Sequence, residues 1–471
     1  MREYKALINN EFIDNGQWVE ILNPTTLDVA GKVSALKEED VNKAYKAARD
    51  AQPQWEAKTL LERIAILKKF RDEILKNKDE LAQIMAEEIA KGVKEALNEV
   101  IRTVEIIDYT FEEVKRLDPL AMTGEGMGAR NKLGIFSRVA KGVVCAISPF
   151  NYPFNLALAK IIPALVTGNT VVFKPATAGS LVGAYMGKLA VDANFPKGIF
   201  NIVTGRGRDI GDIITSNPEI NMISFTGSVN IGKQIRKQGS STDLVLELGG
   251  KDPALVLDDK NLEKYADEII AGAFGYSGQR CTAIKRVLVS DKIADKLVPL
   301  LKTRVEALKV GSPFDNANIT PVIDEKSADF IQGLIDDAKA KNATIVYGDK
   351  KEKNLMWPSL VDHVTVDMKL AWEEPFGPVL PIIRINDVDK MIEIANQSEF
   401  GLQASVFCQD LSTAIKVAKK IETGTVNLNS RPQRGPDCFP FLGIKDSGEG
   451  VQGIRESLIS MTRYKGIVIN Y

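Results

Sequence analysis

A cysteine lies in the segment AFGYSGQRCTAIKRVLV, among small residues and next to a positive charge. Gly275 and Gly278 allow the backbone to approach closely just before Cys281, on a turn that we expect to lead into a strand. Because a neighbouring cation stabilises the thiolate, Arg280 is predicted to lower the pKa of the Cys281 thiol and to favour nucleophilic chemistry. The alternative is a buried and inert cysteine, which composition alone favours.

A carboxylate interrupts the otherwise apolar run LVLELGGKDPALVL. Glu247 lies at the end of an expected strand, shortly before Gly249 and Gly250. Such a carboxylate is either desolvated, with a raised pKa that suits a general base, or paired structurally with a cation such as Lys251. The sequence leaves both interpretations open.

An amide side chain lies between aromatic residues in ISPFNYPFN. Asn151 precedes Pro153 and an expected helix, so its amide group could donate a hydrogen bond into a cleft. The alternative is turn chemistry that caps the helix, which is the simpler interpretation of this residue taken alone.

Two further segments are typical of sites that hold a phosphate. NMISFTGSVNIGKQI predicts a strand, a tight turn at Gly227 and Ser228, and a helix whose first backbone N–H groups can bind phosphate. The pattern is not GxGxxG, so by itself it is a weak dinucleotide signature. In VVFKPATAGS, Lys174 stands at a strand end, where α/β folds place their ligands.

The counts of histidine and cysteine exclude several reaction classes. The chain holds one histidine, His363, through which any His-dependent mechanism would have to run. The four cysteines form no CxxC pair and predict neither a zinc site nor a disulfide framework: Cys145, Cys281, Cys408 and Cys438. We therefore expect no metal, a carboxylate base and, if the protein uses a nucleophile, a thiol.

Length and charge set wider limits. The 471 residues are enough for about three domains of ~150 residues each. Sixty-one basic and 62 acidic side chains leave a formal charge of −1, which gives no electrostatic footprint for nucleic acid or an anionic membrane. Apolar runs stay well short of the ~18 residues of a membrane span, and MREYKALINNEFID has no secretory signal pattern. A cytoplasmic protein is expected.

The elements that must position the candidate residues follow an α/β pattern. Residues 37–116 predict successive amphipathic helices. Strands then alternate with helices from LGIFSRVAKGVVCAIS to TDLVLELGG, and a second alternating series runs from PALVLDD to GTVNLN. This pattern predicts parallel sheets covered on both faces. The tail from about Val451 predicts a strand that pairs with another part of the chain or with another subunit.

Together and in this order, the motifs FNYP, FTGS, LELGGK, GQRC and EEPFGP resemble the aldehyde dehydrogenase superfamily over essentially the whole chain. Within it the chain is similar to the NADP-dependent, non-phosphorylating glyceraldehyde-3-phosphate dehydrogenases. That similarity lies in SPFNYPFNLA, INMISFTGSV, IIAGAFGYSGQRCTAIKRVLV, LAWEEPFGPVLPIIR and QRGPDCFPFLGIKDSG.

The resemblance implies a role for each matching residue. Cys281 would be the nucleophile, and Asn151 with the Cys281 backbone N–H would stabilise the oxyanion, while Glu247 would activate the water that hydrolyses a thioester. The implied cofactor is NADP, because Thr177 stands where NAD-specific relatives commonly carry a glutamate. The other implied cofactor contacts are Ser148, Lys174, Asp212, Gly227, Ser228, Glu374 and Phe376.

The implied substrate is a small phosphorylated aldehyde, whose phosphate the family holds with three arginines and a tyrosine. The counterparts here are Arg102, Tyr152, Arg280 and Arg434. Each has a simpler alternative. Arg102 could pair with Glu99 or Glu105, and Arg280 could serve only to lower the pKa of the Cys281 thiol. Tyr152 could be a core residue, and Arg434 could cap a loop.

The implied fold has two doubly wound parallel-sheet domains and a small oligomerisation sheet, usually in a homotetramer. Residues 1–118 and 140–247 would form the cofactor-binding domain, and residues 248–430 the catalytic domain. Residues 119–139 and 431–471 would form the oligomerisation and C-terminal segments.

Three other functions compete. A CoA-acylating aldehyde dehydrogenase generally lacks the glutamate of LELGG, which is present here as Glu247. A related enzyme could oxidise another anionic semialdehyde, such as succinate semialdehyde. A binding or structural protein could keep the fold without activity, but it would not need Cys281, Glu247 and Asn151 together.

Overall fold

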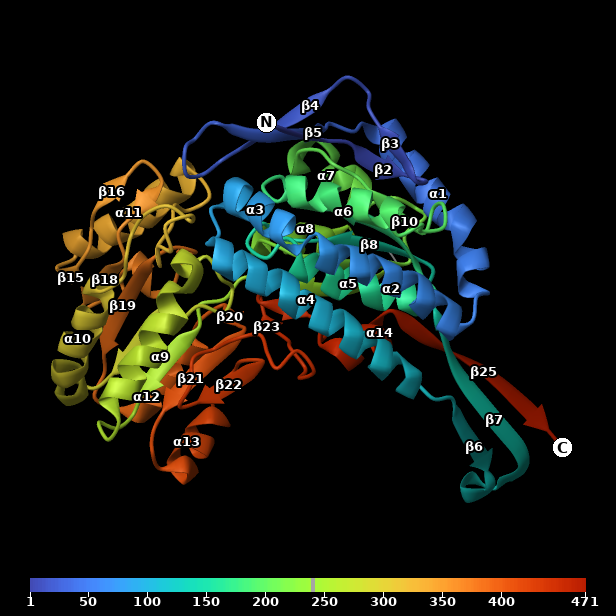
Figure 1. Cartoon of the computed structure of the whole chain (residues 1–471). Coiled ribbons are helices and arrows are strands. Elements are labelled where there is room, and N and C mark those ends of the chain that lie inside the picture. Colours follow the sequence, from blue (N-terminus) through green and yellow to red (C-terminus); the bar gives the residue numbers. More distant parts are fainter. Residues whose placement is uncertain (239–241) are drawn as a thin grey trace.

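Two mainly parallel β-sheets, the first built mostly from the N-terminal half of the chain and the second from the C-terminal half, organise the protein (Figure 1). The computed structural model describes residues 1–238 and 242–471. The first sheet has the strand order β24-β12-β11-β8-β9-β10-β2-β3. Its strands are β2 (Ala6–Ile8), β3 (Glu11–Ile13), β8 (Val143–Ile147), β9 (Thr170–Lys174), β10 (Phe200–Ile202), β11 (Met222–Thr226), β12 (Asp243–Glu247) and β24 (Gly448–Glu449).

The central strands of this sheet are buried on both faces, which is why they read as nearly continuous apolar runs. Successive residues of a strand point to opposite faces. Val144 and Ala146 of β8 face one core, with α2 (Leu60–Lys76), α3 (Lys78–Ile89), α4 (Val93–Glu113), α5 (Asn155–Val166), α6 (Ser180–Asp192) and α14 (Ile454–Ser460). Val143 and Cys145 face the other, with α1 (Glu38–Glu56), α7 (Gly207–Thr215) and α8 (Val229–Lys237).

The chain reverses its direction of travel across the first sheet at β8. β9 and β10 follow on one side of it, whereas β11 and β12 lie on the other, and all five strands are parallel. In open α/β sheets, ligands bind outside the carboxyl ends of the strands at such a reversal. A ligand site is therefore expected at the carboxyl ends of β8, β9, β11 and β12.

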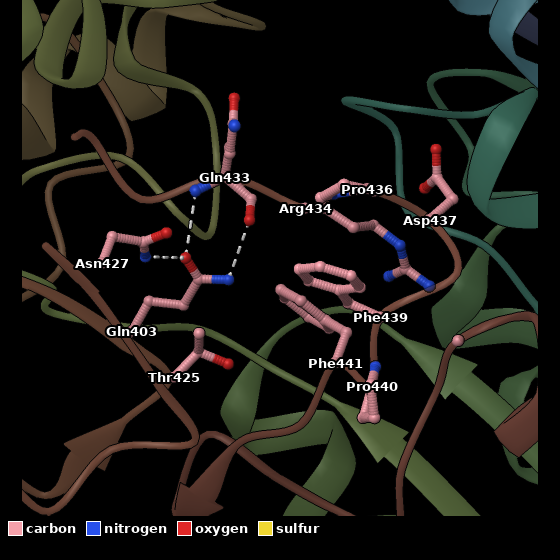
Figure 2. Close-up of a pocket in the computed structure, with 12 residues that line it drawn as sticks. Gln403, Thr425, Asn427, Gln433, Arg434, Pro436, Asp437, Phe439, Pro440 and Phe441 are labelled. Atoms are coloured by element: carbon pink, nitrogen blue, oxygen red, sulfur yellow. Dashed lines mark hydrogen bonds between the residues drawn. The ribbon is translucent and has the colours of Figure 1, made fainter.

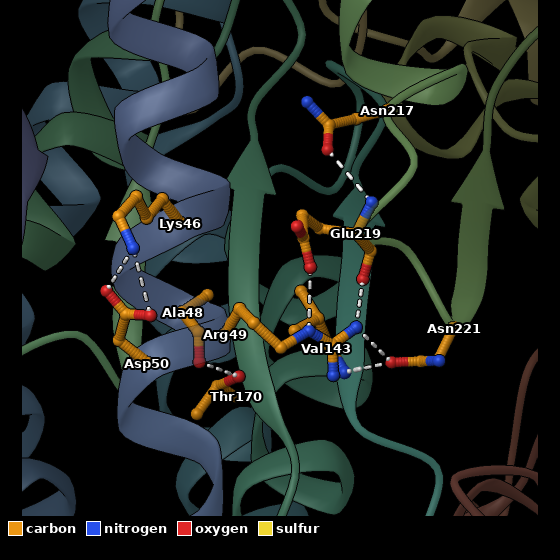
Figure 3. Close-up of polar contacts among 9 residues, drawn as sticks. All are labelled: Lys46, Ala48, Arg49, Asp50, Val143, Thr170, Asn217, Glu219 and Asn221. Atoms are coloured by element: carbon orange, nitrogen blue, oxygen red, sulfur yellow. Dashed lines mark hydrogen bonds and ion pairs between the residues drawn. The ribbon is translucent and has the colours of Figure 1, made fainter.

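The amino ends of the same strands are fastened by a structural polar network (Figure 3). Arg49 of α1 donates through Nε to Glu219 Oε2 at 2.8 Å and through Nη2 to Asn221 Oδ1 at 2.8 Å. The same Asn221 oxygen accepts the backbone N–H of Val143 at 2.9 Å. These contacts join α1 to the starts of β8 and β11, at the end of the sheet opposite to the candidate site.

The second sheet has the order β15-β18-β19-β14-β13-β21-β22 and is parallel except for β15. Its strands are β13 (Pro253–Val256), β14 (Arg286–Val289), β15 (Thr344–Tyr347), β18 (Ser359–Asp362), β19 (Val379–Arg384), β21 (Gln403–Phe407) and β22 (Thr425–Leu428). One face packs on α9 (Leu262–Phe274) and α10 (Asp291–Glu306). The other packs on α11 (Glu325–Ala340), α12 (Val388–Asn396) and α13 (Leu411–Ala418).

A three-stranded antiparallel arm projects from the part of the molecule that contains the first sheet and carries the C-terminus (Figure 1). It consists of β6 (Leu120–Gly124), β7 (Ala129–Ala140) and β25 (Thr462–Asn470). β25 pairs with β7 along its whole length, which confirms that the terminal strand pairs with another part of the chain. Ile467 and Val468 on β25 are exposed apolar residues, so the arm has apolar surface available for a contact.

Smaller sheets complete the fold. They are β1 (Arg2–Tyr4), β5 (Val29–Ser34) and β4 (Trp18–Leu22); β16 (Lys351–Glu352) and β17 (Leu355–Met356); and β20 (Phe400–Gly401) and β23 (Ile444–Lys445). The helices predicted over residues 37–116 and both α/β series are confirmed. Within the described ranges, no helix combines the length and apolar character that crossing a membrane requires.

Candidate active site

Four of the predicted residues follow the carboxyl ends of neighbouring parallel strands. Ser148 follows β8, Lys174 ends β9, Ser228 follows β11 and Glu247 ends β12. The register pairs Ile147 with Lys174 and aligns the ends of β11 and β12, so these positions share one edge of the sheet. The sequence motifs therefore meet at the reversal point, although they lie far apart along the chain.

Asn151 directs its side chain toward the segment that carries Cys281. Asn151 is buried, and its Nδ2 donates a hydrogen bond to the carbonyl oxygen of Gln279 at 2.8 Å. The helix-capping alternative is wrong, because the N-cap of α5 is Phe154. The Gln279 Nε2 is buried and has no hydrogen-bond partner among the described residues. An amide donor thus lies next to the turn of the candidate nucleophile.

Glu247 is almost completely buried and is surrounded by donors. Its Oε2 accepts a hydrogen bond from Thr226 Oγ1 at 2.8 Å and lies 3.9 Å from Lys160 Nζ. Its Oε1 pairs with Nη1 of Arg434. Glu247 is thus paired with Arg434 and not with Lys251, the example of a partner that the sequence offers. Lys251 Nζ donates to the backbone carbonyl oxygen of Glu373.

Arg102 and Arg434 lie in direct contact. Arg102 Nη2 donates to the carbonyl oxygen of Arg434, and Arg102 holds the Asp437 carboxylate through Nε and Nη2, each at 2.7 Å. Pairing of Arg102 with Glu99 or Glu105, the alternative on its own helix, is not what the structure has. Burial alone would lower the pKa of Arg102, but the hydrogen bonds to Asp437 outweigh it and the pKa is raised.

A cavity of about 40 Å³ lies beside Arg434 (Figure 2). Gln403 fixes the backbone just before this arginine: it accepts from Gln433 N at 3.0 Å and donates to Gln433 O at 3.1 Å. The Arg434 guanidinium also donates to Gln452 Oε1 at 2.6 Å and lies 4.8 Å from the centre of the Phe441 ring. Arg434 is thus held in place at a cavity wall and connects it to Glu247.

The described part of the chain gives no alternative centre based on histidine or metal. His363 is exposed just after β18. Among residues 1–238 and 242–471, no group of three or more histidine, cysteine or acidic side chains could hold a metal ion.

Comparison with known proteins gives the family. A family model with the description "Aldehyde dehydrogenase family" matches residues 12–467 of this chain. The chain is 48% identical to the NADP-dependent glyceraldehyde-3-phosphate dehydrogenase of Streptococcus equinus, covering 100% of this chain and 99% of that one. It is 47% identical to the enzyme of the same name from Pisum sativum, covering 97% of this chain and 92% of that one.

A solved structure agrees with this match. The NADP-dependent glyceraldehyde-3-phosphate dehydrogenase from Bacillus halodurans C-125, complexed with NADP, superposes with a TM-score of 0.98 at 50% identity, covering 100% of both chains. The chain belongs to the aldehyde dehydrogenase family. The resemblance drawn from the sequence motifs and the predicted α/β fold are both confirmed.

In this aldehyde dehydrogenase the thiol of Cys281 does not have the lowered pKa that the sequence predicts. Burial raises the pKa of the Cys281 thiol to about 12, and the negative charge of Glu247 is the next largest cause. The prediction for Arg280 was wrong because its guanidinium turns away: Nη2 donates to the carbonyl oxygen of Gly272 at 2.6 Å, at the end of α9. A cation there is favoured by the helix dipole.

The raised pKa predicts slow alkylation of Cys281 at neutral pH. Because the thiolate fraction grows as pH approaches the pKa, the rate should rise about tenfold per pH unit above pH 7. Glu247→Gln removes a charge that disfavours the thiolate, so it should lower the pKa and accelerate alkylation at fixed pH. Mass spectrometry of the Cys281 peptide, in a Cys438→Ser background that removes an exposed thiol, measures both. A rate that levels off below pH 9 would contradict the raised pKa.

The side chains expected at the cofactor include polar groups that can still form hydrogen bonds. Ser148 Oγ is buried without a hydrogen-bond partner in the described ranges, and burial lowers the pKa of Lys174 to about 8. Ser228 is the N-cap of α8, whose first N–H groups lie just beyond it. At Gly227 a Cβ would lie only 2.5 Å from the Phe225 ring, so the turn requires glycine. These groups fit a ligand rich in phosphate oxygens.

Thr177 is not the cap of the helix that follows it. The buried carboxylate of Glu88 accepts hydrogen bonds from the backbone N–H groups of Gly179, Leu181 and Val182 at 3.1, 2.9 and 2.9 Å. Burial raises the pKa of Glu88 to about 7, against the effect of those donors. The start of α6 is therefore held by Glu88, which leaves the Thr177 side chain for another role.

Glu374 packs against the glycine turn that follows Glu247. Its Oε1 accepts the Gly250 N–H at 3.1 Å and lies 3.0 Å from Lys285 Nζ, which also donates to the carbonyl oxygen of Cys281. A Cβ at Gly249 would lie 2.2 Å from Glu374 Oε2. The two glycines of LELGG therefore make room for a carboxylate that is linked through Lys285 to the cysteine turn.

The two remaining cofactor candidates differ in their surroundings. Phe376 has a left-handed backbone (φ 49°) and meets the Phe150 ring edge-on at 5.8 Å between centroids. Asp212 is exposed on α7, where its carboxylate accepts from Nε2 of Gln234 on α8 at 2.7 Å and from Nε2 of Gln238, the residue that follows α8, at 3.3 Å.

Lys160 is a site residue that the sequence analysis missed. It is fully buried, and its Nζ donates to Thr226 Oγ1 at 2.6 Å, next to Glu247. Burial lowers its pKa to about 8, while the charge of Glu247 acts in the opposite direction. The available signal was a single lysine within the apolar helix sequence NLALAKIIPALV.

Proposed function

We propose that this aldehyde dehydrogenase oxidises glyceraldehyde 3-phosphate to 3-phosphoglycerate with NADP and water. The observation that carries the proposal is the contact chain from Glu247 through Arg434 to Arg102. It joins a buried carboxylate, suited to activate water, to two guanidinium groups, suited to hold a phosphate dianion. The names of the relatives with 48% and 47% identity support the same substrate and cofactor.

In the proposed mechanism, the Cys281 thiol first loses its proton to solvent, and the thiolate that results attacks the aldehyde carbon and forms a thiohemiacetal. The oxyanion is stabilised by Asn151 Nδ2 and the Cys281 backbone N–H, a kind of donor worth ~3 kcal/mol of barrier. NADP, when bound, supplies the acceptor for the hydrogen that leaves this carbon together with its electron pair, which turns the thiohemiacetal into a thioester. Glu247 then takes a proton from water, which attacks the resulting thioester and releases the acid and the thiol.

We assign the phosphate of the substrate to Arg102, Arg434 and Tyr152, with Arg280 as the fourth candidate. Arg280 is the weakest of these, because its guanidinium already binds the carbonyl oxygen at the end of α9. Ser148, Lys174, Thr177, Asp212, Gly227, Ser228, Glu374 and Phe376 are assigned to NADP. The buried and unpartnered Ser148 Oγ supports this assignment within the described chain.

We also propose a cytoplasmic homotetramer, assembled through the arm of β6, β7 and β25. The exposed side chains of Ile467 and Val468 support this role of the arm. The proposed division of the chain is the one that the resemblance implies: a cofactor-binding domain of residues 1–118 and 140–247, a catalytic domain of residues 248–430, and the arm with the C-terminal segment.

A substrate panel tests the proposed function. NADPH formation is followed with glyceraldehyde 3-phosphate, unphosphorylated glyceraldehyde and succinate semialdehyde, each with NADP and with NAD, in buffer without inorganic phosphate or CoA. The proposal expects the highest kcat/KM with glyceraldehyde 3-phosphate and NADP. A preference for succinate semialdehyde would overturn the substrate, and a requirement for CoA would overturn the hydrolytic step.

Thr177→Glu is predicted to shift the cofactor preference toward NAD. A carboxylate would repel the 2′-phosphate of NADP and could accept hydrogen bonds from the ribose hydroxyl groups of NAD, whereas threonine is neutral and can donate. The measurement is the ratio of kcat/KM for NADP to that for NAD. Thr177→Gln is the matched control of similar size without the charge. An unchanged ratio in Thr177→Glu would contradict this role of residue 177.

A further inference from the structure

An ion pair outside the proposed chemistry is completely buried behind the active site. Lys91 lies in the short connection between α3 and α4, and Glu99 lies in the second turn of α4. Lys91 Nζ pairs with Glu99 Oε2, and each side chain is only 1% exposed. Burying two charges removes both from water, and this cost largely cancels their attraction, so such a pair adds little net stability. Its contacts therefore need another explanation.

The pair holds the turn of Asn151 from both sides. Lys91 Nζ donates to the carbonyl oxygen of Asn151 at 2.8 Å. The second carboxylate oxygen of Glu99, Oε1, accepts the backbone N–H groups of Phe154 at 3.2 Å and Asn155 at 2.9 Å. The two charges thus fix the backbone at the start and at the end of the turn that presents the Asn151 amide.

The Lys91 ammonium also lies between two aromatic rings. Its Nζ is 3.6 Å from the centre of the Tyr152 ring and 4.7 Å from that of Tyr276, and the two rings meet edge-on at 6.3 Å. Tyr276 has a left-handed backbone (φ 49°), and its hydroxyl donates to Ile89 O at 2.8 Å. Tyr276 belongs to the segment that ends at Cys281. One cation therefore contacts both chain segments that supply the site.

The same face of α4 continues this support. Thr103 Oγ1 donates to the carbonyl oxygen of Glu99 at 2.6 Å and accepts from Asn155 Nδ2 at 3.0 Å. Arg102, one turn beyond Glu99, faces Asp437 and the loop of Arg434. The position of α4 is thereby linked to the oxyanion donor and to the arginines through direct hydrogen bonds.

We propose that Lys91 and Glu99 are positioning residues, which hold the Asn151 amide at the oxyanion. The inference rests on the proposed function for the role of Asn151. It does not depend on which aldehyde is the natural substrate, because every aldehyde oxidised by this mechanism passes through an oxyanion.

The test variant is Lys91→Met/Glu99→Gln, which replaces the ion pair by neutral side chains of similar size. The control is Arg384→Met/Asp362→Asn, which removes a largely buried pair of the second sheet, with Nη2–Oδ2 at 2.8 Å. Rapid mixing with NADP and the best aldehyde of the parent enzyme measures the first NADPH formed, and thermal unfolding is followed in parallel. A displaced donor can cost about a hundredfold in rate, so we expect a loss of about ten- to a hundredfold in the test variant only. An equal loss in the control would overturn the proposal.

A double-mutant cycle with Asn151→Ala separates positioning from general damage. If the pair acts through the Asn151 amide, replacing it in the Asn151→Ala background should cost less than about threefold. Losses that multiply would overturn the proposal. Lys91→Arg keeps the charge and the donors, so it should retain about a third or more of the parent rate, and a rate as low as that of Lys91→Met/Glu99→Gln would contradict it.

A folding defect would not leave the proposal untested. Glu99→Gln alone keeps Lys91 and keeps an acceptor for the two N–H groups, so this variant retains the most native contacts. We expect about a three- to tenfold loss that again disappears in the Asn151→Ala background, and persistence of that loss would overturn the proposal. Failure of the proposed function is seen separately, as a parent enzyme that does not prefer glyceraldehyde 3-phosphate in the substrate panel.

Discussion

Replacing Cys281 by alanine will abolish aldehyde oxidation, whereas replacing Glu247 by alanine will leave the first half of the reaction intact. In the proposed mechanism Cys281 supplies the sulfur that bonds to the substrate. In the described part of the chain, none of the other three cysteines forms a hydrogen bond with Asn151: Cys145 is buried in β8, Cys408 is buried just after β21, and Cys438 is exposed. In the same mechanism Glu247 acts only when water attacks the thioester. Rapid mixing of Glu247→Ala with aldehyde and NADP should give one NADPH per active site, followed by little turnover.

The surroundings of Glu247 decide which controls this experiment needs. Arg434 and Lys160 both lie at its carboxylate, so Glu247→Ala leaves two cations without their partner. Glu247→Gln keeps the shape and an acceptor for Thr226 Oγ1, and should also stall after one turnover. Steady turnover of either variant at the parent rate would show that another group activates the water. A missing burst in both would show that Glu247 also acts in the first step.

Much of this site was predictable because its motifs are local. Ser148, Lys174, Ser228 and Glu247 each end or follow an apolar strand, and parallel strands bring their carboxyl ends to one edge. Alternation of strands and helices was enough to predict that edge. The N-terminal sheet of β1, β5 and β4 was not predicted as a separate unit, because short strands carry a weak pattern.

The direction of long side chains was not predictable in the same way. Arg280 is adjacent to Cys281 in sequence, yet it reaches the carbonyl oxygen of Gly272 and does not lower the thiol pKa. Arg434 is 187 residues from Glu247, and their contact depends on how the C-terminal loop crosses the first sheet. Nothing in the sequence around Lys91 indicates that this lysine forms a buried ion pair. Contacts of this kind depend on tertiary packing, and no periodic pattern in the sequence predicts them.

Arg102→Ala is expected to lower kcat/KM for glyceraldehyde 3-phosphate by about ten- to a hundredfold, because a charged hydrogen bond contributes about 1.5–3 kcal/mol. With unphosphorylated glyceraldehyde the loss should largely vanish. Arg102 already pairs with Asp437, so the phosphate must either share Arg102 with that carboxylate or displace the carboxylate from it. Asp437→Asn should therefore weaken the competition and lower KM for the phosphorylated substrate.

For Arg434→Ala the structure changes the expectation drawn from sequence alone. The sequence predicts a loss confined to the phosphorylated substrate, as for Arg102. Because Arg434 also binds Glu247, its removal alters the surroundings of the base. We expect about ten- to a hundredfold lower kcat/KM with glyceraldehyde 3-phosphate, as above, and in addition slower turnover after the first NADPH with unphosphorylated glyceraldehyde.

The matched control for both arginines is Arg431→Ala. Arg431 lies in the same loop, but its guanidinium pairs with Glu268 at 3.2 Å rather than with Glu247 or Asp437. Its removal should change kcat/KM by less than about threefold with either substrate, as expected for a partly exposed ion pair. Equal losses on both substrates in Arg102→Ala would show that Arg102 does not bind the phosphate. Unchanged turnover of unphosphorylated glyceraldehyde in Arg434→Ala would show that its contact with Glu247 has no part in hydrolysis.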